Sequence, residues 1–403
     1  MRIETHTWKP EDIIKNLRSR RVINATGTMT SLGGNVLSQN VLQSIGYVSD
    51  IFVNMKKLSE DVNKYIAKRL GVESAYVTQS ASASIVLSVA ALVVRLNGGE
   101  SLNISPVNTK DRYVAVQKMH KSEFRRLVEL SGVEVLEFGT DDETMVESLE
   151  KVLLEYEGKL VGVLHFVFDP LPGSLSLEEV IRISHSRDVP VIVDAAAELP
   201  PKTNLTNFVN MGADLVAFSG GKMIGSLSNS GILLGKSELI ELVSKLGPLN
   251  EEIVNGKTEI FIGRPMKVSK ETLVATVTAL DEFLNMDEVN WLESLKKLNA
   301  KIISKLNSNP NILKASIAEP KWYHPRPAIV PRVEIILNKN IQADEFKTRL
   351  EGSKIPIYVY TDQGRVYINP QCLKPEDIDI LTSSITELAE TILDEQSGMN
   401  ENN

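Results

Sequence analysis

Short apolar runs alternate with amphipathic stretches over residues 74–240 of this chain. The runs are rich in β-branched residues and have the length of strands, whereas the stretches between them carry apolar residues at helical spacing. The predicted strands and the helices that follow them are 75–78 and 82–96, 112–116 and 121–131, 134–138 and 142–156, and 160–166 and 176–187, with further strands at 190–194, 213–218 and 231–235. This alternation is typical of an α/β fold with a doubly wound, mainly parallel sheet covered by helices on both faces.

The pattern changes on both sides of this region. Residues 1–20 indicate a short polar helix, 21–27 a strand or loop, and 36–70 carries helical spacing. A long helical pattern over 269–284 is suited to connect two domains. Beyond it we predict helices at 289–307 and 375–394, with strands at 312–318, 329–338, 355–360 and 365–369 between them. That order indicates a small α+β carboxyl-terminal domain.

These patterns divide the 403 residues into four parts. We expect an amino-terminal arm over 1–35, a large ligand-binding domain over 36–265, a connecting helix and small carboxyl-terminal domain over 266–394, and a polar, disordered tail over 395–403.

Composition narrows the class of protein. A net charge of −8 argues against a general binder of nucleic acid or membrane surfaces. The only cysteine, Cys372, excludes an internal disulfide, and five scattered histidines without an HExxH motif argue against a metal site. The amino terminus lacks the apolar core of a signal peptide, and no apolar run approaches membrane-spanning length. We therefore expect a cytoplasmic protein.

Two of the predicted strands end in groups of complementary chemistry. The run 191–194 delivers the carboxylate of Asp194, and the run 214–219 leads to the amine of Lys222. Pyridoxal phosphate needs both, because its aldehyde binds a lysine and its ring nitrogen needs an acid. Ligands of parallel sheets bind at the carboxyl ends of the strands, where Thr78, His120, Asp194 and Ser219 are expected. The pattern favours an enzyme that acts on amino groups.

Lys222 follows its strand through Ser219, Gly220 and Gly221, which permit a tight turn and a close approach to a ligand. A desolvated lysine has a depressed pKa and becomes a nucleophile for a Schiff base. The alternative is an ordinary surface lysine after a turn. Ser219-x-x-Lys222 also matches the Ser–Lys motif of some acyl hydrolases, but that motif normally opens a helix, and its partner motifs are absent.

Asp194 stands in an apolar setting, where a carboxylate is costly unless it meets a cation. A protonated pyridine nitrogen is such a cation, and Ala196 is small enough to lie against a flat ring. The alternative for Asp194 is a helix N-cap. Glu198 is open to a solvated, a supporting or a catalytic role.

Residues 78–84 join a strand to an apolar helix, and the amides at such a helix start bind phosphate. Ser80, Ala81 and Ser82 are the expected phosphate cup, although Ser and Thr favour helix starts in any case. His120 follows the strand 112–116 and is placed to stack on the cofactor ring or to move protons, unless it is an exposed loop histidine. His165 lies within an apolar strand and is interpreted as a core residue.

Arginines are the candidates for binding the carboxylate of an amino acid substrate. Arg365 begins a strand of the small domain, with a structural salt bridge as its alternative role. Arg264 precedes the connecting helix and is suited to reach a phosphate or an acidic substrate, within its own subunit or across a dimer interface. Arg326 and Arg332 are weaker candidates of the same kind.

Four segments resemble the fold-type-I pyridoxal-phosphate enzymes, and within them the selenocysteine synthase-like branch. The segments are 22–34, 193–200, 212–222 and 263–270. The Gly-Thr-Met-Thr-Ser-Leu-Gly-Gly and Ser-Gly-Gly-Lys sequences are more similar to the D-glucosaminate-6-phosphate ammonia-lyase group than to selenocysteine synthase itself. The resemblance implies pyridoxal phosphate as cofactor, a large sheet domain of the seven-stranded type, and a homodimer or higher oligomer. It also implies substrate contacts from Thr28.

By that resemblance we expect a lyase that acts by α,β-elimination on a hydroxylated, sugar-derived 2-amino acid: the β-hydroxyl leaves as water, and hydrolysis then gives a 2-oxo acid and ammonia. Lys222, Asp194 and His120 are its expected catalytic residues. A selenocysteine synthase-like transferase is disfavoured, because only about 20 residues precede the signature and the chain is acidic, features that argue against tRNA binding. An aminotransferase or racemase would use the same lysine, and a silent scaffold would keep the fold without the cofactor.

Overall fold

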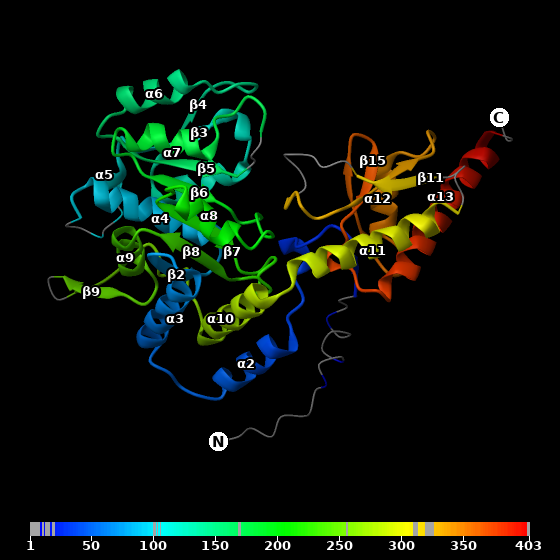
Figure 1. Ribbon diagram of the computed structural model, residues 1–403, viewed down its shortest axis with the longest axis horizontal. Helices are drawn as coiled ribbons and strands as arrows, with labels where there is room; N and C mark the ends of the chain where they lie inside the picture. Colours follow the sequence, from blue (N-terminus) through cyan, green and yellow to red (C-terminus); the bar gives the residue numbers. More distant parts are fainter. Residues whose placement is uncertain are drawn as a thin grey trace. The chain divides into compact units, whose positions relative to one another are not determined.

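The computed structural model describes residues 9, 12, 17, 21–99, 102, 104, 106–167, 171–254, 257–308, 313–318 and 326–400. The chain divides into two compact units (Figure 1). The large unit is Gly33–Glu288 with Lys321–Ile329, and the small unit is Met1–Leu32, Val289–Pro320 and Val330–Asn403.

A seven-stranded sheet forms the centre of the large unit. Its strands are β2 (Ser74–Thr78), β3 (Tyr113–Gln117), β4 (Glu134–Phe138), β5 (Leu160–Phe166), β6 (Val191–Asp194), β7 (Leu215–Ser219) and β8 (Gly231–Gly235). Their order is β2-β8-β7-β6-β5-β3-β4, and β8 alone runs antiparallel to its two neighbours. The prediction of a mainly parallel, doubly wound sheet is confirmed.

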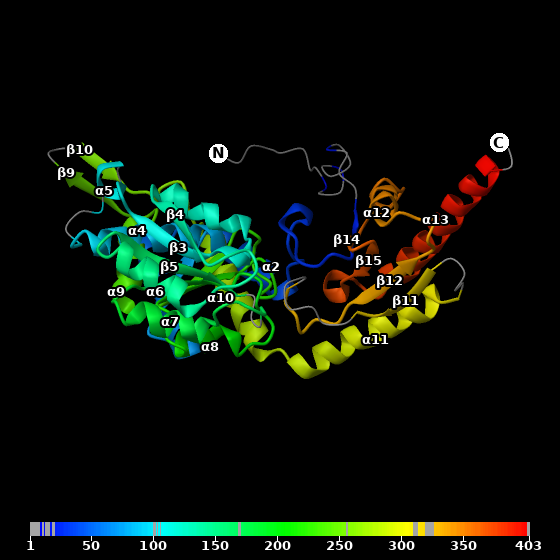
Figure 2. The ribbon, with the colours of Figure 1, turned by 90° about the horizontal axis from the view of Figure 1, so that it is seen from above.

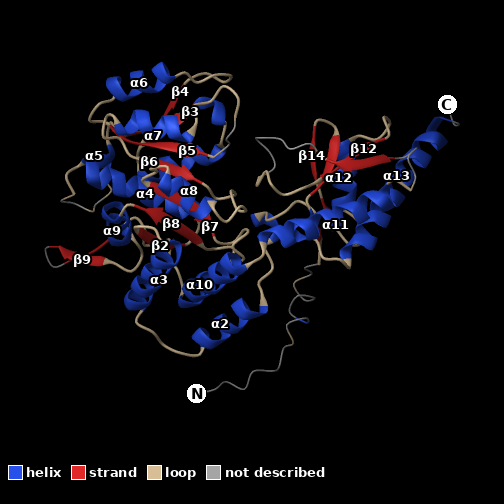
Figure 3. Cartoon of the chain, in the orientation of Figure 1, coloured by secondary structure: helices blue, strands red, loops and turns tan. Residues whose placement is uncertain are grey.

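The strands are apolar throughout because both faces of the sheet are buried. Along β6, Val191 and Val193 join one hydrophobic core, whereas Ile192 joins the other. The first core includes side chains of α3 (Met55–Leu70), α6 (Val146–Glu155), α7 (Leu177–His185), α8 (Asn204–Asn210) and α10 (Lys270–Asn285), and the second includes those of α4 (Ala81–Leu96) and α9 (Ser237–Leu246). Figure 3 shows these helices around the strands.

Local capping explains where several helices begin and end. The helical spacing over 36–70 belongs to two helices, α2 (Gln39–Ser49) and α3, because Asn54 caps α3 by accepting a hydrogen bond from the Lys57 amide. Gly71 ends α3 in the left-handed conformation, at φ 67°. Ser176 and Glu179 form a capping box at the start of α7. The predicted helix at 121–131 is the 3₁₀ helix η3 (Glu123–Ser131).

The small unit contains a four-stranded antiparallel sheet of order β11-β12-β15-β14. Its elements are β1 (Ile23–Asn24), α11 (Glu288–Leu306), β11 (Leu313–Ile317), β12 (Val333–Leu337), α12 (Ala343–Glu351), β13 (Ile357–Tyr358), β14 (Tyr360–Asp362), β15 (Arg365–Ile368) and α13 (Asp377–Asn400). β1 pairs in parallel with β13, and Figure 2 shows α11 alongside β11 and β12. Apolar side chains of α11, α12 and α13 form one core with the strands.

The boundaries of the two units differ from the expected domain boundaries. We expected a division at 265, but α10 packs into the core of the large unit through Leu273, Leu280 and Phe283, and the division follows Glu288. Residues 21–32 of the expected arm belong to the small unit. α13 continues to Asn400, where we expected a disordered tail from 395.

Several short elements have no counterpart in the sequence prediction. They are α5 (Pro106–Thr109), α8, α9, α12 and the antiparallel hairpin of β9 (Glu251–Val254) and β10 (Lys257–Ile260). The predicted helix over 1–20 lies almost wholly outside the described residues. None of the helices in the described part of the chain is both long enough and apolar enough to cross a membrane.

Candidate active site

Asp194 and Lys222 meet at the carboxyl ends of two neighbouring strands. β6 and β7 are parallel, and Asp194 pairs in register with Ala217 of β7. Two residues later β7 ends at Ser219, from which the chain turns into the loop that carries Lys222. The ends of β3 and β5 lie at the same edge of the sheet, because these strands run in the same direction.

The loop after β7 is tightly closed around Lys222. The Gly220 amide donates to the Ser230 carbonyl at 2.9 Å, and the Ser226 amide donates to the Gly220 carbonyl at 2.9 Å. A Cβ at Gly220 would lie 2.3 Å from Ser230 Oγ, and one at Gly221 would lie 2.4 Å from the Ser228 Cα. Both glycines are therefore required by close approach of the backbone, as the sequence indicated.

Lys222 has the electrostatics of a nucleophilic amine. Its side chain is half-buried, and burial lowers the pKa of the amine, while the carboxylates of Asp194 and Glu198 oppose that shift. A lowered pKa increases the fraction of neutral amine, which is the form that attacks a carbonyl. The alternative of an ordinary solvated lysine does not describe this environment.

Asp194 provides the carboxylate of the site. Burial raises its pKa, and a hydrogen bond from the Ala196 amide at 3.0 Å and the charge of Lys222 oppose that rise. The N-cap alternative is wrong, because the next helix, α8, begins only at Asn204 and its N-cap position is Thr203. Ala196 follows two residues after Asp194, in the turn that this hydrogen bond closes.

Glu198 forms a buried ion pair with Arg326. Arg326 Nε lies 2.9 Å from Glu198 Oε1, and a second contact joins Arg326 Nη2 to Glu198 Oε2. Burial raises the pKa of Glu198, and the guanidinium of Arg326 opposes that rise. Glu198 also affects the pKa of Lys222, so this pair belongs to the electrostatic environment of the amine. Arg326 was expected only as a weaker candidate for binding an acidic group of the substrate, and its pairing with Glu198, 128 residues away, was not predicted.

A cavity of about 390 Å³ adjoins the Glu198–Arg326 pair. Residues from the end of β5, the start of α7 and the helix α8 line it, including Val167, Ser174 and Phe208. Of the residues discussed for the site, only Glu198 and Arg326 line this cavity, which therefore lies on the side of the ion pair.

The start of α4 offers a seat for a phosphate. Ser80 is the N-cap, and its hydroxyl accepts a hydrogen bond from the Ala83 amide at 3.0 Å. Ala81 and Ser82 occupy the first turn, where main-chain amides point out of the helix. A Cβ at Gly231 of β8 would lie 2.5 Å from the Ser80 carbonyl carbon, so strand and helix start are closely packed.

His120 is buried in a small polar network, so the alternative of an exposed loop histidine is wrong. Gln117 exchanges two hydrogen bonds with the main chain of Leu175, at 3.0 and 2.9 Å, which fixes the orientation of its amide. Its Nε2 faces His120 Nε2 at 3.3 Å and His165 Nδ1 at 3.4 Å. Gln117 has two amide protons and donates one to Leu175, so one proton remains for these two ring nitrogens.

Burial lowers the pKa of His120 to about 4, and that of His165 falls well below its usual value. Both imidazoles are therefore neutral at neutral pH. The His120 ring packs edge-on against His165, with centroids 4.9 Å apart, and lies 6.2 Å from Phe166, the register partner of Asp194. This environment suits His120 for stacking and hydrogen-bond donation better than for proton transfer.

The arginines expected to bind substrate have other partners. Arg365 lies exposed at the start of β15, and its Nη1 contacts Glu334 Oε1 at 2.8 Å, which matches the salt-bridge alternative. Arg264 is exposed, and its Nη1 donates to the Pro248 carbonyl at 3.1 Å. Thr28 belongs to the small unit, as Arg365 does. Substrate roles for these three residues stay predictions.

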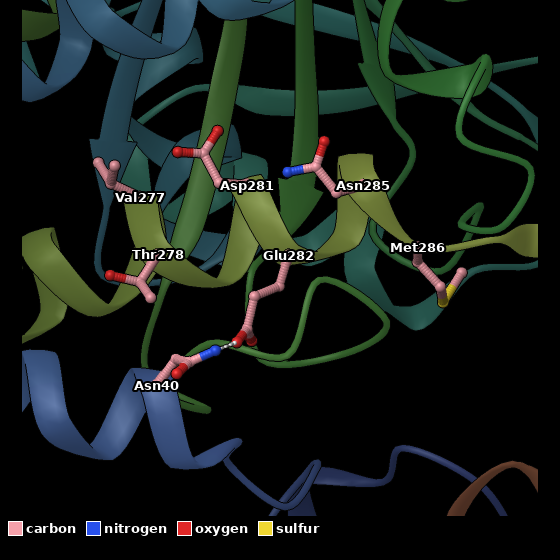
Figure 4. Close-up of a pocket in the computed structure, with 7 residues that line it drawn as sticks. All are labelled: Asn40, Val277, Thr278, Asp281, Glu282, Asn285 and Met286. Atoms are coloured by element: carbon pink, nitrogen blue, oxygen red, sulfur yellow. Dashed lines mark hydrogen bonds between the residues drawn. The ribbon is translucent and has the colours of Figure 1, made fainter.

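A second, open groove of about 660 Å³ runs along α10 (Figure 4). Glu282 points from α10 toward α2, where its carboxylate accepts hydrogen bonds from Asn40 Nδ2 at 2.7 Å and Ser38 Oγ at 2.6 Å. None of the predicted site residues lines this groove. The hydrogen bonds of Glu282 beside this groove join the start of α2 to α10.

The site residues fit pyridoxal phosphate. The half-buried amine of Lys222 suits the aldehyde, the carboxylate of Asp194 suits the ring nitrogen, and the first turn of α4 suits the phosphate. A metal ion fits less well, since the described residues contain no group of three His, Cys, Asp or Glu side chains able to hold one.

The model of the L-seryl-tRNA selenium transferase family matches residues 22–374. The chain belongs to this family. It is therefore an enzyme with the fold of the fold-type-I pyridoxal-phosphate enzymes, and its cofactor is pyridoxal 5′-phosphate.

Relatives with known names cover almost the whole chain. D-glucosaminate-6-phosphate ammonia lyase from Salmonella typhimurium is 25% identical over 95% of this chain and 99% of its own length. L-seryl-tRNA(Sec) selenium transferase from Aquifex aeolicus is 23% identical over 94% of this chain and 87% of its own length. A solved structure of D-glucosaminate-6-phosphate ammonia-lyase has a TM-score of 0.76 at 23% identity, covering 96% of this chain and 100% of that one.

Proposed function

We propose that this protein is a pyridoxal-phosphate-dependent ammonia lyase that acts on a hydroxylated, sugar-derived 2-amino acid. The observation that carries the proposal is the half-buried Lys222 amine, with its lowered pKa, beside the carboxylate of Asp194. The similarity to an ammonia lyase along 99% of that enzyme's length supports the reaction type and the substrate class.

The chain's own residues account for the proton movements of such an elimination. Bound pyridoxal phosphate supplies an electron sink for negative charge on the substrate's α-carbon. Asp194 holds a proton at the ring nitrogen, and Lys222, as a neutral amine, removes the proton from the α-carbon. The substrate then loses its β-hydroxyl as water, and addition of water releases its amine as ammonia, leaving a 2-oxo acid.

The surrounding residues hold the cofactor and the substrate in position. The first turn of α4, with Ser80, Ala81 and Ser82, anchors the phosphate, and Ser219 lies at the end of β7 beside it. Neutral His120 is the residue that would lie against the ring. Arg264 and Arg365 stay candidates for the acidic groups of the substrate.

Ammonia release from a panel of amino-sugar acids and β-hydroxy amino acids tests the proposal, with D-glucosaminate-6-phosphate included. Lys222→Ala should abolish both ammonia release and the visible absorbance of the bound cofactor. Lys57→Ala is the matched control, because Lys57 is exposed and pairs with Asp61 on α3, away from the strand ends, so this variant should keep both. Full turnover by Lys222→Ala would refute the assignment of the lysine.

A tRNA-linked transferase is the second candidate function, and the family match and the Aquifex relative favour it. The net charge of −8 weighs against binding a polyanion. A gel-shift titration with seryl-tRNA separates the two candidates. A specific shift at micromolar protein, together with no ammonia release from any amino acid of the panel, would replace the lyase by the transferase.

We further propose that the enzyme is a homodimer. The family resemblance implies it, and the segment around α2 supports it, because Val36, Tyr47 and Phe52 are largely exposed apolar side chains. Light scattering should give twice the chain mass of 44.6 kDa. Tyr47→Ser with Phe52→Ser should lower that mass at the same concentration, and a monomeric parent protein would contradict the proposal.

A further inference from the structure

Asn35 contacts the main chain on both sides of Lys222. Its Nδ2 lies 2.7 Å from the Gly221 carbonyl oxygen and 2.9 Å from that of Ser226, with the Lys222 carbonyl oxygen at 3.4 Å. Three carbonyl oxygens thus surround one amide nitrogen, which has two protons to donate. The amide orientation follows, because an oxygen in that place would face three acceptors.

The backbone beside Asn35 is built for this approach. Gly34 has φ of +81°, and a Cβ there would lie 2.8 Å from the Gly221 carbonyl oxygen and 3.3 Å from Ser228 Cβ. Any side chain at position 34 would push the segment away from the loop. Two independent features, a glycine and an amide, therefore bring residues 34–35 against the peptide units next to Lys222.

The other end of the same segment is fixed to a helix. Ser38 and Asn40 bind the carboxylate of Glu282 on α10 (Figure 4), and α10 is packed in the core of the large unit. Ser226, the last residue that Asn35 contacts, is linked to α10 as well, through a 3.0 Å contact between its hydroxyl and that of Thr276. Asn35 is therefore held on a rigid support.

We infer that Asn35 is a positioning residue for Lys222: it fixes the Gly221 and Lys222 peptide units and thereby holds the amine at the ends of β6 and β7. Two main-chain hydrogen bonds close the loop from within, and the Asn35 amide adds a restraint from outside it by joining the Gly221 and Ser226 carbonyls. The inference depends on Lys222 as the cofactor-binding lysine and not on the identity of the substrate.

Hydrogen exchange of the cofactor-free protein tests the restraint directly. In Asn35→Ala, amides of residues 220–227 should exchange ~10-fold faster or more, since the loss of about two hydrogen bonds frees the loop. Asn97→Ala is the matched control: it removes an asparagine side chain that donates to a main-chain carbonyl, that of Asn108, at the carboxyl-terminal end of α4, and should leave exchange in the loop unchanged. Loop exchange within twofold of the parent in Asn35→Ala would overturn the inference.

Asn35→Asp provides a second measurement, the pH midpoint of the cofactor absorbance, which would not change if Asn35 had only a structural role. The substitution keeps the shape of the side chain and, above the pKa of the new carboxyl, which the three facing carbonyl oxygens raise, it adds negative charge beside the Lys222 peptide group. An added negative charge favours the cationic form of the lysine nitrogen. The absorbance–pH midpoint of the cofactor-bound enzyme should therefore shift to higher pH, and an unchanged or lower midpoint would overturn the inference.

Asn35→Ser serves if the other variants fail to fold. One hydroxyl proton replaces two amide protons, so loop exchange should fall between the parent and a fully released loop, and parent-like exchange would contradict the inference. The exchange experiment uses no substrate, so it separates this inference from the lyase proposal. A protein that releases no ammonia can still show the loop effect, and an active lyase can fail to show it.

Discussion

Removing the guanidinium of Arg326 should strongly destabilise the large unit. The side chains of Glu198 and Arg326 are only 5% and 11% exposed, so Arg326→Met leaves a carboxylate buried without its counter-ion. Breaking one partner of a buried pair costs roughly 3–5 kcal/mol of unfolding free energy. Replacing both partners by apolar residues is often close to neutral, so Arg326→Met with Glu198→Leu should lie within roughly 1–2 kcal/mol of the parent.

The loss should also depend on pH. The guanidinium lowers the pKa of Glu198, so without it that pKa rises further above its value in the unfolded chain. A raised carboxyl pKa means that the folded state binds the proton more tightly and that the penalty is largest at high pH. The destabilisation by Arg326→Met should therefore be greater at pH 8 than at pH 5.5.

The assay has to report on the large unit, since the chain contains two compact units and a whole-chain transition does not isolate one of them. Native-state hydrogen exchange of peptides from β6 and β7, measured in increasing urea on cofactor-free protein, does so. Asn204→Ala is a useful control, because the Asn204 side chain donates to the main-chain carbonyl of Glu198 and not to its carboxylate, so its removal leaves the ion pair intact. A loss below about 1 kcal/mol at pH 8, or one that does not change with pH, would refute the reasoning.

Three further predictions follow from the site. The pKa of His120 is about 4 against 6.5 in the unfolded chain, so this group removes about 3 kcal/mol of stability as pH falls from 6.5 to 4; His120→Phe should reduce the pH dependence of the opening free energy of β3 and β5, measured over that window by native-state hydrogen exchange in urea, and an unchanged pH dependence would contradict it. Asp194→Asn should lower the pKa of Lys222, seen as faster labelling of Lys222 by an amine reagent at pH 8 without cofactor. Gly231→Ala should cost roughly 1–3 kcal/mol in thermal unfolding, because its methyl group meets Ser80.

The features that could be predicted from the sequence are local ones. The apolar runs located all seven strands of the large sheet, and the polar residues at their ends identified Asp194 and Lys222 as neighbours. The Ser-rich segment after β2 likewise marked the start of α4, with Ser80 as N-cap. Each of these features depends on a few consecutive residues and on the fixed geometry of parallel strands.

Contacts between residues that are far apart in the sequence were not predicted. Asn35 and Gly221 are 186 residues apart, and neither segment has a periodicity that reports the contact. A glycine pair followed by an amide, at 33–35, is the only local signal, because such a backbone is suited to close approach. The amphipathic pattern of α10 predicted a helix but not the unit into which it packs, which is why the expected boundary at 265 differs from the division after Glu288.

The return of residues 321–329 to the large unit limits how this protein can be shortened or recombined. The chain passes from one unit to the other four times, after Leu32, Glu288, Pro320 and Ile329. A gene fragment that stops at codon 288 encodes the entire central sheet yet omits the arginine that neutralises Glu198. A carboxyl-terminal half exchanged between distant relatives would bring its own residue at position 326, which would have to meet a compatible acid at position 198. The two halves are therefore expected to be inherited together.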